Sequence, residues 1–212
     1  MRLTLASASP ARREILRRAG IAHTVCSSAV DEAAVLAAAH RERGPLAIRD
    51  QVGVLARAKA LDVAERLEDA HYTVGCDSLF ELDGVVVGKP GTRARARARL
   101  KAMAGQTGTL WTGHCLAVRR GTRLETYAAE RATRVTIAPL SATEIEAYLA
   151  TGEPLNVAGS FTIDGYGGAF IDRIEGDHLN VIGLSLPVLR ELLAEAGTAL
   201  TDFWQARPAE GS

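Results

Sequence analysis

The segment SASPARR near the N-terminus has the composition of a phosphate-binding loop. It follows a short strand-like alternation, and Ser9 and Pro10 then open a helical pattern that ends at Gly20. The first turn of a helix presents unpaired backbone N–H groups, and hydroxyl or guanidinium groups such as those of Ser7, Ser9 and Arg12 can bind phosphate oxygens beside them. A plain helix cap with solvated arginines would have the same sequence, so spacing alone leaves both interpretations open.

A second group of polar residues follows a predicted strand at 72–76. Asp77 and Ser78 come directly after it, and Lys89 lies in a Gly-Lys-Pro segment beyond a predicted hairpin. An Asp at a strand end can hold a hard divalent cation or orient a water, and a nearby Lys can neutralise phosphate. A turn Asp and a surface Lys remain the competing interpretation.

Glu32 and Lys59 are further candidates. Glu32 follows the second predicted strand, and Lys59 lies on a predicted amphipathic helix at 45–67. Only three of the 25 Lys and Arg residues are lysines, and two of those three are Lys59 and Lys89. In a chain that uses Arg almost everywhere, a retained Lys indicates a need for a compact point charge. Solvated surface is the alternative for both Glu32 and Lys59.

Strands and helices alternate irregularly with hairpins, which predicts an α/β fold with a mixed sheet. The predicted elements are strands at 2–5 and 21–27, helices at 9–20 and 45–67, a strand at 72–76, a hairpin around Asp83-Gly84, a β pair within 109–138 around Arg120-Gly121, a helix at 141–150, a glycine-rich β stretch at 161–174 and a helix from 186 to 196.

The run TRARARARLKAM at 92–103 is the low-complexity part of the chain. Ala and Arg are good helix formers, and Leu100 and Met103 supply an apolar anchor. The composition favours a helix with a solvated face, with a phosphate or nucleic-acid contact and a strand as alternatives.

Composition and charge exclude several classes. The 212 residues carry a net charge of +0 and are 47% hydrophobic, so a DNA coat or a polybasic membrane anchor is not expected. No apolar run reaches the ~20 residues of a membrane span and no secretory signal is visible, which predicts a cytoplasmic protein. Cys26, Cys76 and Cys115 have neither disulfide nor zinc-site spacing. The length predicts a single two-lobed domain over 1–205 and a short tail at 206–212.

Together, several segments resemble the Maf family of nucleoside triphosphate pyrophosphatases, in order, from Leu3 to about Leu189. They are LASASPARREIL, VDE, LARAKA, GCDSLFELDGVVVGKP and YLATGEPLNVAGSFTIDGYGGAFIDRIEGDHLNVIGLSLPVL. The resemblance implies an elongated mixed β-sheet flanked by helices, similar to the inosine triphosphatase group, with a cleft between two lobes. It also implies metal-dependent hydrolysis of a nucleoside triphosphate to a monophosphate and pyrophosphate, which would clear non-canonical or modified nucleotides.

The resemblance also implies roles for individual residues. They are Asp77 as the catalytic proton acceptor, Ser7, Ser9, Arg12, Lys59 and Lys89 as phosphate ligands, and Asp77 with Glu32 as ligands of Mg²⁺ or Mn²⁺. All-oxygen ligation of this kind suits a hard cation that shares its coordination with phosphates. The implied partner is the nucleotide, with no membrane or nucleic-acid partner, and a homodimer is one option for the assembly.

Three positions depart from the family's substrate groups. Members that act on uridine and thymidine triphosphates typically read S-P-R-R, D-K-A-G and Q-G, and those that act on 7-methylguanosine triphosphate read S-P-W-R-R, C-A-G-S-F and E-G. Here Ala11, Ser78 and Asp164 stand at the differing positions and fit neither group. Because a carboxylate only accepts hydrogen bonds, Asp164 favours the N–H groups of guanine-type or modified purine bases. Alternatively, Asp164 caps the turn before Gly165 and faces solvent.

A rival function is a catalytically weak nucleotide- or nucleic-acid-binding regulator of cell division or septation that uses Arg93 to Arg99 as its contact. The joint presence of Asp77, Lys59 and Lys89 favours the enzyme, because a binding protein needs charge but no particular geometry of metal and base.

Overall fold

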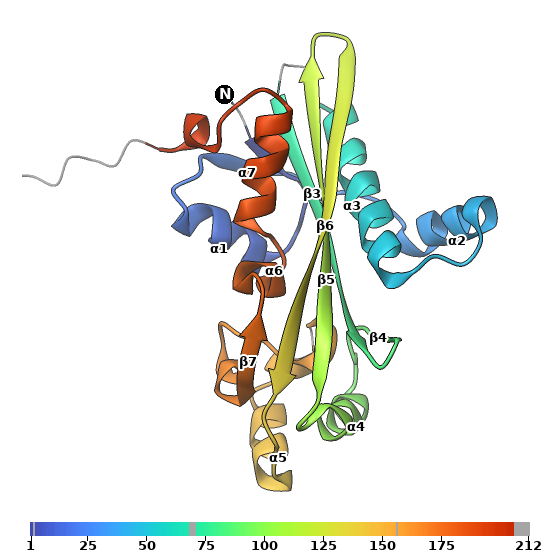
Figure 1. The fold of residues 1–212 in the computed structure, drawn as a ribbon, viewed down its shortest axis with the longest axis vertical. Helices are drawn as coiled ribbons and strands as arrows, with labels where there is room; N and C mark the ends of the chain where they lie inside the picture. Colours follow the sequence, from blue (N-terminus) through green and yellow to red (C-terminus); the bar gives the residue numbers. More distant parts are fainter. Residues whose placement is uncertain (2, 68–70, 156, 206–212) are drawn as a thin grey trace, which may run out of the picture.

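The computed structural model describes residues 1, 3–67, 71–155 and 157–205, so the predicted tail at 206–212 lies outside the described residues. The described residues form an elongated seven-stranded sheet in the order β2-β1-β3-β5-β6-β7, with β4 beside β3 (Figure 1). The strands are β1 (Leu3–Leu5), β2 (His23–Val25), β3 (His71–Leu82), β4 (Val85–Val87), β5 (Thr107–Arg120), β6 (Arg123–Ile137) and β7 (Ile171–Glu175). β1 pairs in parallel with β2 and β3, and the other pairs are antiparallel. The predicted α/β class with a mixed sheet is therefore confirmed.

Helices cover both faces of the sheet, with α1, α6 and α7 on one side and α2 and α3 on the other (Figure 1). The helices are α1 (Pro10–Arg18), α2 (Glu32–Arg43), α3 (Ile48–Glu65), α4 (Arg93–Met103), α5 (Ala142–Ala150), α6 (His178–Ile182) and α7 (Leu186–Glu195). Short 3₁₀ turns lie at Glu153–Leu155, Ala158–Ser160, Tyr166–Phe170 and Leu200–Phe203. Among the described residues, no helix combines the length and the apolar character that crossing a bilayer requires.

Separate hydrophobic clusters lie toward the two ends of the long strands, and the part of the molecule around each is here called a lobe. In the N-terminal lobe, Leu5 and Cys76 of the sheet pack with Leu16 of α1 and Leu189 of α7. The other lobe centres on a cluster that contains Phe80 and neighbouring apolar side chains of α4, β5 and β6. Since β3, β5 and β6 contribute residues to both clusters, these three strands connect the two lobes.

Most of the predicted elements are confirmed, with different end residues. The hairpin turns at Asp83-Gly84, where both residues have positive φ, and α3 and α7 lie inside their predicted ranges. The predicted strand at 72–76 continues to Leu82 as one 12-residue β3. The structure also contains α2 and α6, which the hydrophobic pattern did not predict.

The predicted β stretch at 161–174 is wrong before Ile171. Its glycines serve close packing in 3₁₀ turns: a Cβ on Gly167 would lie 2.7 Å from the carbonyl oxygen of Thr162, and a Cβ on Gly168 would lie 2.8 Å from that of Ile163. Only Ile171–Glu175 pairs with the sheet, as β7.

The arginine run forms α4, as its composition favoured. Ala96, Leu100 and Met103 are buried, and Arg93 and Arg97 both pair with Glu146 of α5. The guanidinium of Arg99 donates to the carbonyl of Gly88. Much of the positive charge of the run is therefore neutralised or bonded within the protein, which does not favour the rival function that uses it as a nucleic-acid contact.

Candidate functional site

The loop after β1 lies at the point where the direction of the chain across the sheet reverses. From β1, the chain crosses to β2 through α1 on one face, and it crosses back to β3 through α2 and α3 on the other face. In open α/β sheets, the carboxyl ends of the strands at such a switch point form the usual crevice for ligands. β1 ends at Leu5, whereas β3 continues beyond its partner Val74 to Asp77 and Ser78. The loop at 6–9, here called the serine loop, therefore lies near these two β3 residues at the carboxyl end of β1.

Hydrogen bonds fix the serine loop. Ser9 is the N-cap of α1 and accepts a hydrogen bond from the backbone N–H of Arg12 at 3.4 Å. The buried Ser7 Oγ accepts from the backbone N–H of Ser9 and from Nη1 of Arg12, both at 3.2 Å. The cap interpretation of Ser9 is confirmed, and it is compatible with a phosphate loop because both hydroxyls stay beside the positive end of α1.

Arg12 is held on three sides, so its solvated interpretation is wrong. Its Nε donates to the carbonyl oxygen of Gly183 at 2.7 Å, and Nη2 donates to Ser78 Oγ at 3.1 Å. Ser78 Oγ lies 2.9 Å from Thr112 Oγ1, which donates to the carbonyl of Asn180 at 3.0 Å. This chain of contacts fixes the direction in which the guanidinium points.

A buried acid–base pair lies on the opposite face of β3. Lys59 Nζ is 2.6 Å from Asp77 Oδ1 and 2.7 Å from Glu32 Oε1. The side chains of Lys59 and Asp77 are 11% and 10% exposed, whereas that of Glu32, at the start of α2, is 54% exposed. The structure thus brings together three predicted site residues, with Lys59 between the two carboxylates.

The sequence places Lys59 within the buried stripe of α3, where Ala56 and Ala60 are its neighbours at the sheet. Gly75 lies opposite these alanines and allows α3 to approach β3 closely. Because side chains alternate along a strand, Asp77 points to the same face as Gly75, toward α3. Cys76, between them, belongs to the core cluster that packs with α1 and α7 on the other face.

Burial raises the pKa of Asp77 above its ordinary value. The positive charge and hydrogen bond of Lys59 act in the opposite direction without cancelling this effect, and the negative charge of Glu32 adds to it. A raised pKa brings a carboxylate nearer to the range in which it can accept a proton as a general base at neutral pH.

The donor set of Asp77 and Glu32 fits a divalent cation that also binds the substrate. Each carboxylate uses one oxygen on Lys59, so its second oxygen can face a cation. Within the described ranges, no three His, Cys, Asp or Glu side chains form a cluster of the kind that holds a metal by itself. Mg²⁺ commonly binds through one or two carboxylates together with substrate phosphates and waters, which this pair can satisfy.

Lys89 is not brought into contact with this group. It is exposed in the segment that follows β4, and β4 pairs with the far end of β3 at Phe80–Leu82. Lys89 lies on the other lobe, next to Gly88, the residue that Arg99 contacts.

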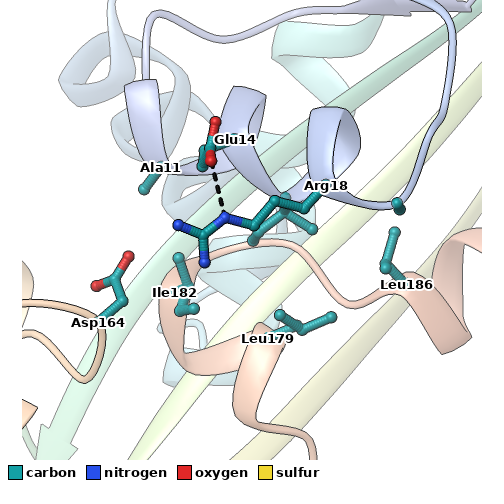
Figure 2. Close-up of a pocket in the computed structure, with 9 residues that line it drawn as sticks. Ala11, Glu14, Arg18, Asp164, Leu179, Ile182 and Leu186 are labelled. Carbon is teal, nitrogen blue, oxygen red and sulfur yellow. Dashed lines mark hydrogen bonds and ion pairs between the residues drawn. The ribbon is translucent and has the colours of Figure 1, made fainter.

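Two of the three predicted base-selecting residues line one pocket. Ala11 and Asp164 face each other across a cavity of about 230 Å³ between α1 and α6 (Figure 2). Its other lining residues are Glu14, Ile15, Arg18, Ala19, Leu179, Ile182 and Leu186. Ser78 does not line this pocket and contacts Arg12 instead. Asp164 is exposed, and nothing in the structure assigns it to capping the turn before Gly165.

Glu153, to which the sequence patterns assigned no role, holds the loop that carries Asp164. Its carboxylate accepts hydrogen bonds from the hydroxyls of Tyr148 and Thr162 and from the backbone N–H groups of Tyr166 and Gly167, at 2.6 to 2.9 Å. Burial tends to raise the pKa of Glu153, but these hydrogen bonds outweigh it and lower the pKa. The sequence Gly152-Glu153-Pro154 indicates a turn, but it does not indicate that the Glu153 carboxylate accepts hydrogen bonds from several partners.

The fold and the site define the class: an α/β protein with hydroxyl and guanidinium donors on one side of a switch point and a buried Lys–Asp pair on the other. The family model described as Maf-like protein matches residues 2–196, and the chain belongs to this family. It is 49% identical over 208 residues to a protein of Nocardia farcinica, covering 96% of both chains, and 50% identical over 210 residues to one of Streptomyces coelicolor, covering 99% of this chain and 96% of the relative. Both relatives are named nucleoside triphosphate pyrophosphatase.

Among solved structures, the Ham1 protein of Staphylococcus aureus matches with a TM-score of 0.38 and 13% identity, over 65% of this chain and 72% of that chain. This likeness is too weak to bear on the fold or on the site.

Proposed function

We propose that this protein hydrolyses nucleoside triphosphates to nucleoside monophosphates and pyrophosphate with the help of Mg²⁺ or Mn²⁺. The observation that carries the proposal is Lys59, held between Asp77 and Glu32, with the charge of Arg12 acting on Asp77 from the serine loop side. The names of the relatives agree with this activity.

The triphosphate would bind at the start of α1. The hydroxyl groups of Ser7 and Ser9 would donate hydrogen bonds to phosphate oxygens. Arg12 would direct its guanidinium at phosphate oxygens from a position that Gly183 and Ser78 already fix. Because these groups are oriented before the substrate arrives, little reorganisation is needed to stabilise the charge of the reacting phosphate. Lys89 is proposed as a further phosphate ligand, which would have to contact the substrate from the other lobe.

Asp77 would act as the general base. The oxygen that Lys59 does not contact has two lone pairs: one would face the cation, and the other would accept a proton from a water that attacks the α-phosphorus. Lys59 would hold the carboxylate in place through the other oxygen. The bond from the α-phosphorus to the bridging oxygen breaks and pyrophosphate leaves. A cation held by Asp77 and Glu32 would supply Lewis-acid stabilisation of the phosphate charge.

The base would lie in the pocket between α1 and α6, since Ala11 of this pocket directly precedes Arg12 of the phosphate site. Asp164 would accept hydrogen bonds from the base, which favours guanine-type or modified purines and agrees with a role in clearing such nucleotides. Ala11 leaves this part of the pocket wide.

The test is hydrolysis of a panel of canonical and modified triphosphates by the full chain with Mg²⁺ or Mn²⁺ in ¹⁸O-labelled water. We expect pyrophosphate as the unlabelled product and the label in the monophosphate, because attack occurs at the α-phosphorus. A chelator should abolish turnover. Release of orthophosphate and a diphosphate, or activity that survives excess chelator, would contradict the proposal.

A further inference from the structure

Arg18 lines the same pocket as Ala11 and Asp164. Ala11, Glu14 and Arg18 occupy one face of α1 at spacings of three and four residues, so their side chains form a row along the pocket. Figure 2 shows the Arg18 guanidinium between Glu14 on one side and Asp164 with Ile182 on the other. A guanidinium and a carboxylate from two segments distant in the sequence thus line the same pocket.

The guanidinium of Arg18 is available to a ligand. Its Nε lies 2.7 Å from Glu14 Oε1, which leaves the two terminal nitrogens for other partners, and the side chain is 74% exposed. Exposed ion pairs of this spacing are weak, so little is lost when Arg18 exchanges Glu14 for a ligand. Glu14 keeps a second partner, because Arg17 binds it through two hydrogen bonds of 2.6 Å. Hydrogen bonds from Arg17 and then Arg18 lower the pKa of Glu14 to about 2, so its charge persists.

The remaining walls suit a flat apolar ring. Ile15, Leu179, Ile182 and Leu186 line the pocket with branched aliphatic side chains. Its volume of about 230 Å³ is below the roughly 300 to 1,000 Å³ of pockets that enclose drug-sized ligands, so it can hold one part of a nucleotide, such as the base.

We propose that Arg18 is a base-reading residue that donates to the acceptor edge of a guanine-type base while Asp164 accepts from its donor edge. Guanine presents O6 and N7 as adjacent acceptors, and an arginine fork matches them with two hydrogen bonds. Adenine presents an amino donor at the position of O6, which a guanidinium repels. The inference rests on the proposed function, because it requires a nucleotide in this pocket.

The experiment compares GTP, ATP and 7-deaza-GTP, which lacks the N7 acceptor, as substrates of the full chain and of Arg18→Ala. We expect the wild type to favour GTP over ATP, and Arg18→Ala to lower kcat/KM for GTP about 10-fold, within the range for one bidentate contact to a base. The loss should be smaller with 7-deaza-GTP and close to zero with ATP. Arg17→Ala is the matched control, since Arg17 shares the partner Glu14 but does not line this pocket.

Each outcome is decisive. An equal loss with all three triphosphates, an unchanged GTP to ATP ratio, or an Arg17→Ala variant that behaves like Arg18→Ala would overturn the inference while the proposed function stands. A wild type that hydrolyses none of a wider triphosphate panel would overturn the proposed function itself. Thermal unfolding of both variants checks that the fold is intact, as expected for exposed side chains.

Discussion

Gly75 of β3 and Ala60 of α3 are in such close contact that a Cβ on Gly75 would lie 2.6 Å from the backbone nitrogen of Ala60. The same Cβ would lie 2.5 Å from the carbonyl oxygen of Ala56, so Gly75→Ala must move backbone rather than a flexible side chain. We expect the free energy of unfolding to fall by about 2 kcal/mol or more, and turnover to fall because Lys59 is displaced from Asp77.

Denaturant unfolding measures the first effect, and the proposed pyrophosphate-release assay measures the second. Gly88→Ala is the stability control, since a Cβ there meets no atom within 4 Å. If Gly75→Ala unfolds like the wild type, the close approach of α3 to β3 does not control the site.

Replacing Asp77 tests the proposed base. Asp77→Asn keeps the size of the side chain but cannot accept the proton of the attacking water, so kcat should fall by roughly 100-fold or more. Substrate binding, measured by calorimetry, should persist because the serine loop is untouched. Turnover close to that of the wild type would rule out Asp77 as the base.

Arg12→Ala should lower kcat/KM by a similar factor for every triphosphate, because Arg12 would contact phosphate oxygens that all substrates share. Lys89→Ala should act in the same way if the substrate reaches Lys89 from the serine loop. Arg95→Ala is the control, since Arg95 is an exposed arginine of α4 to which no phosphate contact is assigned. A loss of activity in Arg95→Ala, or salt-dependent nucleic-acid binding that disappears with it, would support the rival function instead.

Asp164→Gln tests the predicted acceptor. Gln offers a donor as well as acceptors, which suits the mixed edge of uracil or thymine, so the kcat/KM ratio should shift toward pyrimidine triphosphates. The measurement is a ranking of substrates rather than a single rate. An unchanged ranking would show that Asp164 does not contact the base.

His114 should make stability depend on pH. Burial, and then the charge of Arg12, lower the pKa of His114 to about 4, and its Nε2 accepts a hydrogen bond from the N–H of Ser185 at 2.8 Å. The unfolded chain therefore takes up the proton first as pH falls. The contribution of neutral His114 to the free energy of unfolding is complete above pH ~6.5. It is lost progressively between pH ~6.5 and ~4, by on the order of 3 kcal/mol.

The check is denaturant unfolding of the wild type and of His114→Asn between pH 7.5 and 4.5. The difference between the two stability curves isolates His114, because the other acid-sensitive groups are common to both. Parallel curves would show that His114 does not titrate in this range.

The sequence was informative where one local rule determines the structure. Ser9-Pro10 predicted the start of α1, Asp83-Gly84 predicted the hairpin, and the helix-forming Ala and Arg composition with its apolar anchor favoured helix α4. Local patterns also identified Asp77 and Lys59 as candidates.

What local patterns could not predict depends on distant contacts. The Gly183 carbonyl that fixes Arg12 is 171 positions away in the chain, and periodicity carries no information on such a pair. The glycines at 165–168 suggested a strand, but their role is to pack tightly against Tyr148, Glu153 and the Thr162–Ile163 backbone. A resemblance supplied the order of the motifs, whereas the face of β3 on which each side chain lies became visible only in three dimensions.

The four hydrogen bonds that Glu153 accepts fix the conformation of the loop at 162–167 without using the side chain of Asp164. The anchors are the hydroxyls of Tyr148 and Thr162 and two backbone N–H groups, and Asp164 is not among them. The side chain at position 164 can therefore be exchanged without rebuilding the loop beneath it. Such an arrangement lets selectivity evolve by single substitutions while the scaffold stays constant.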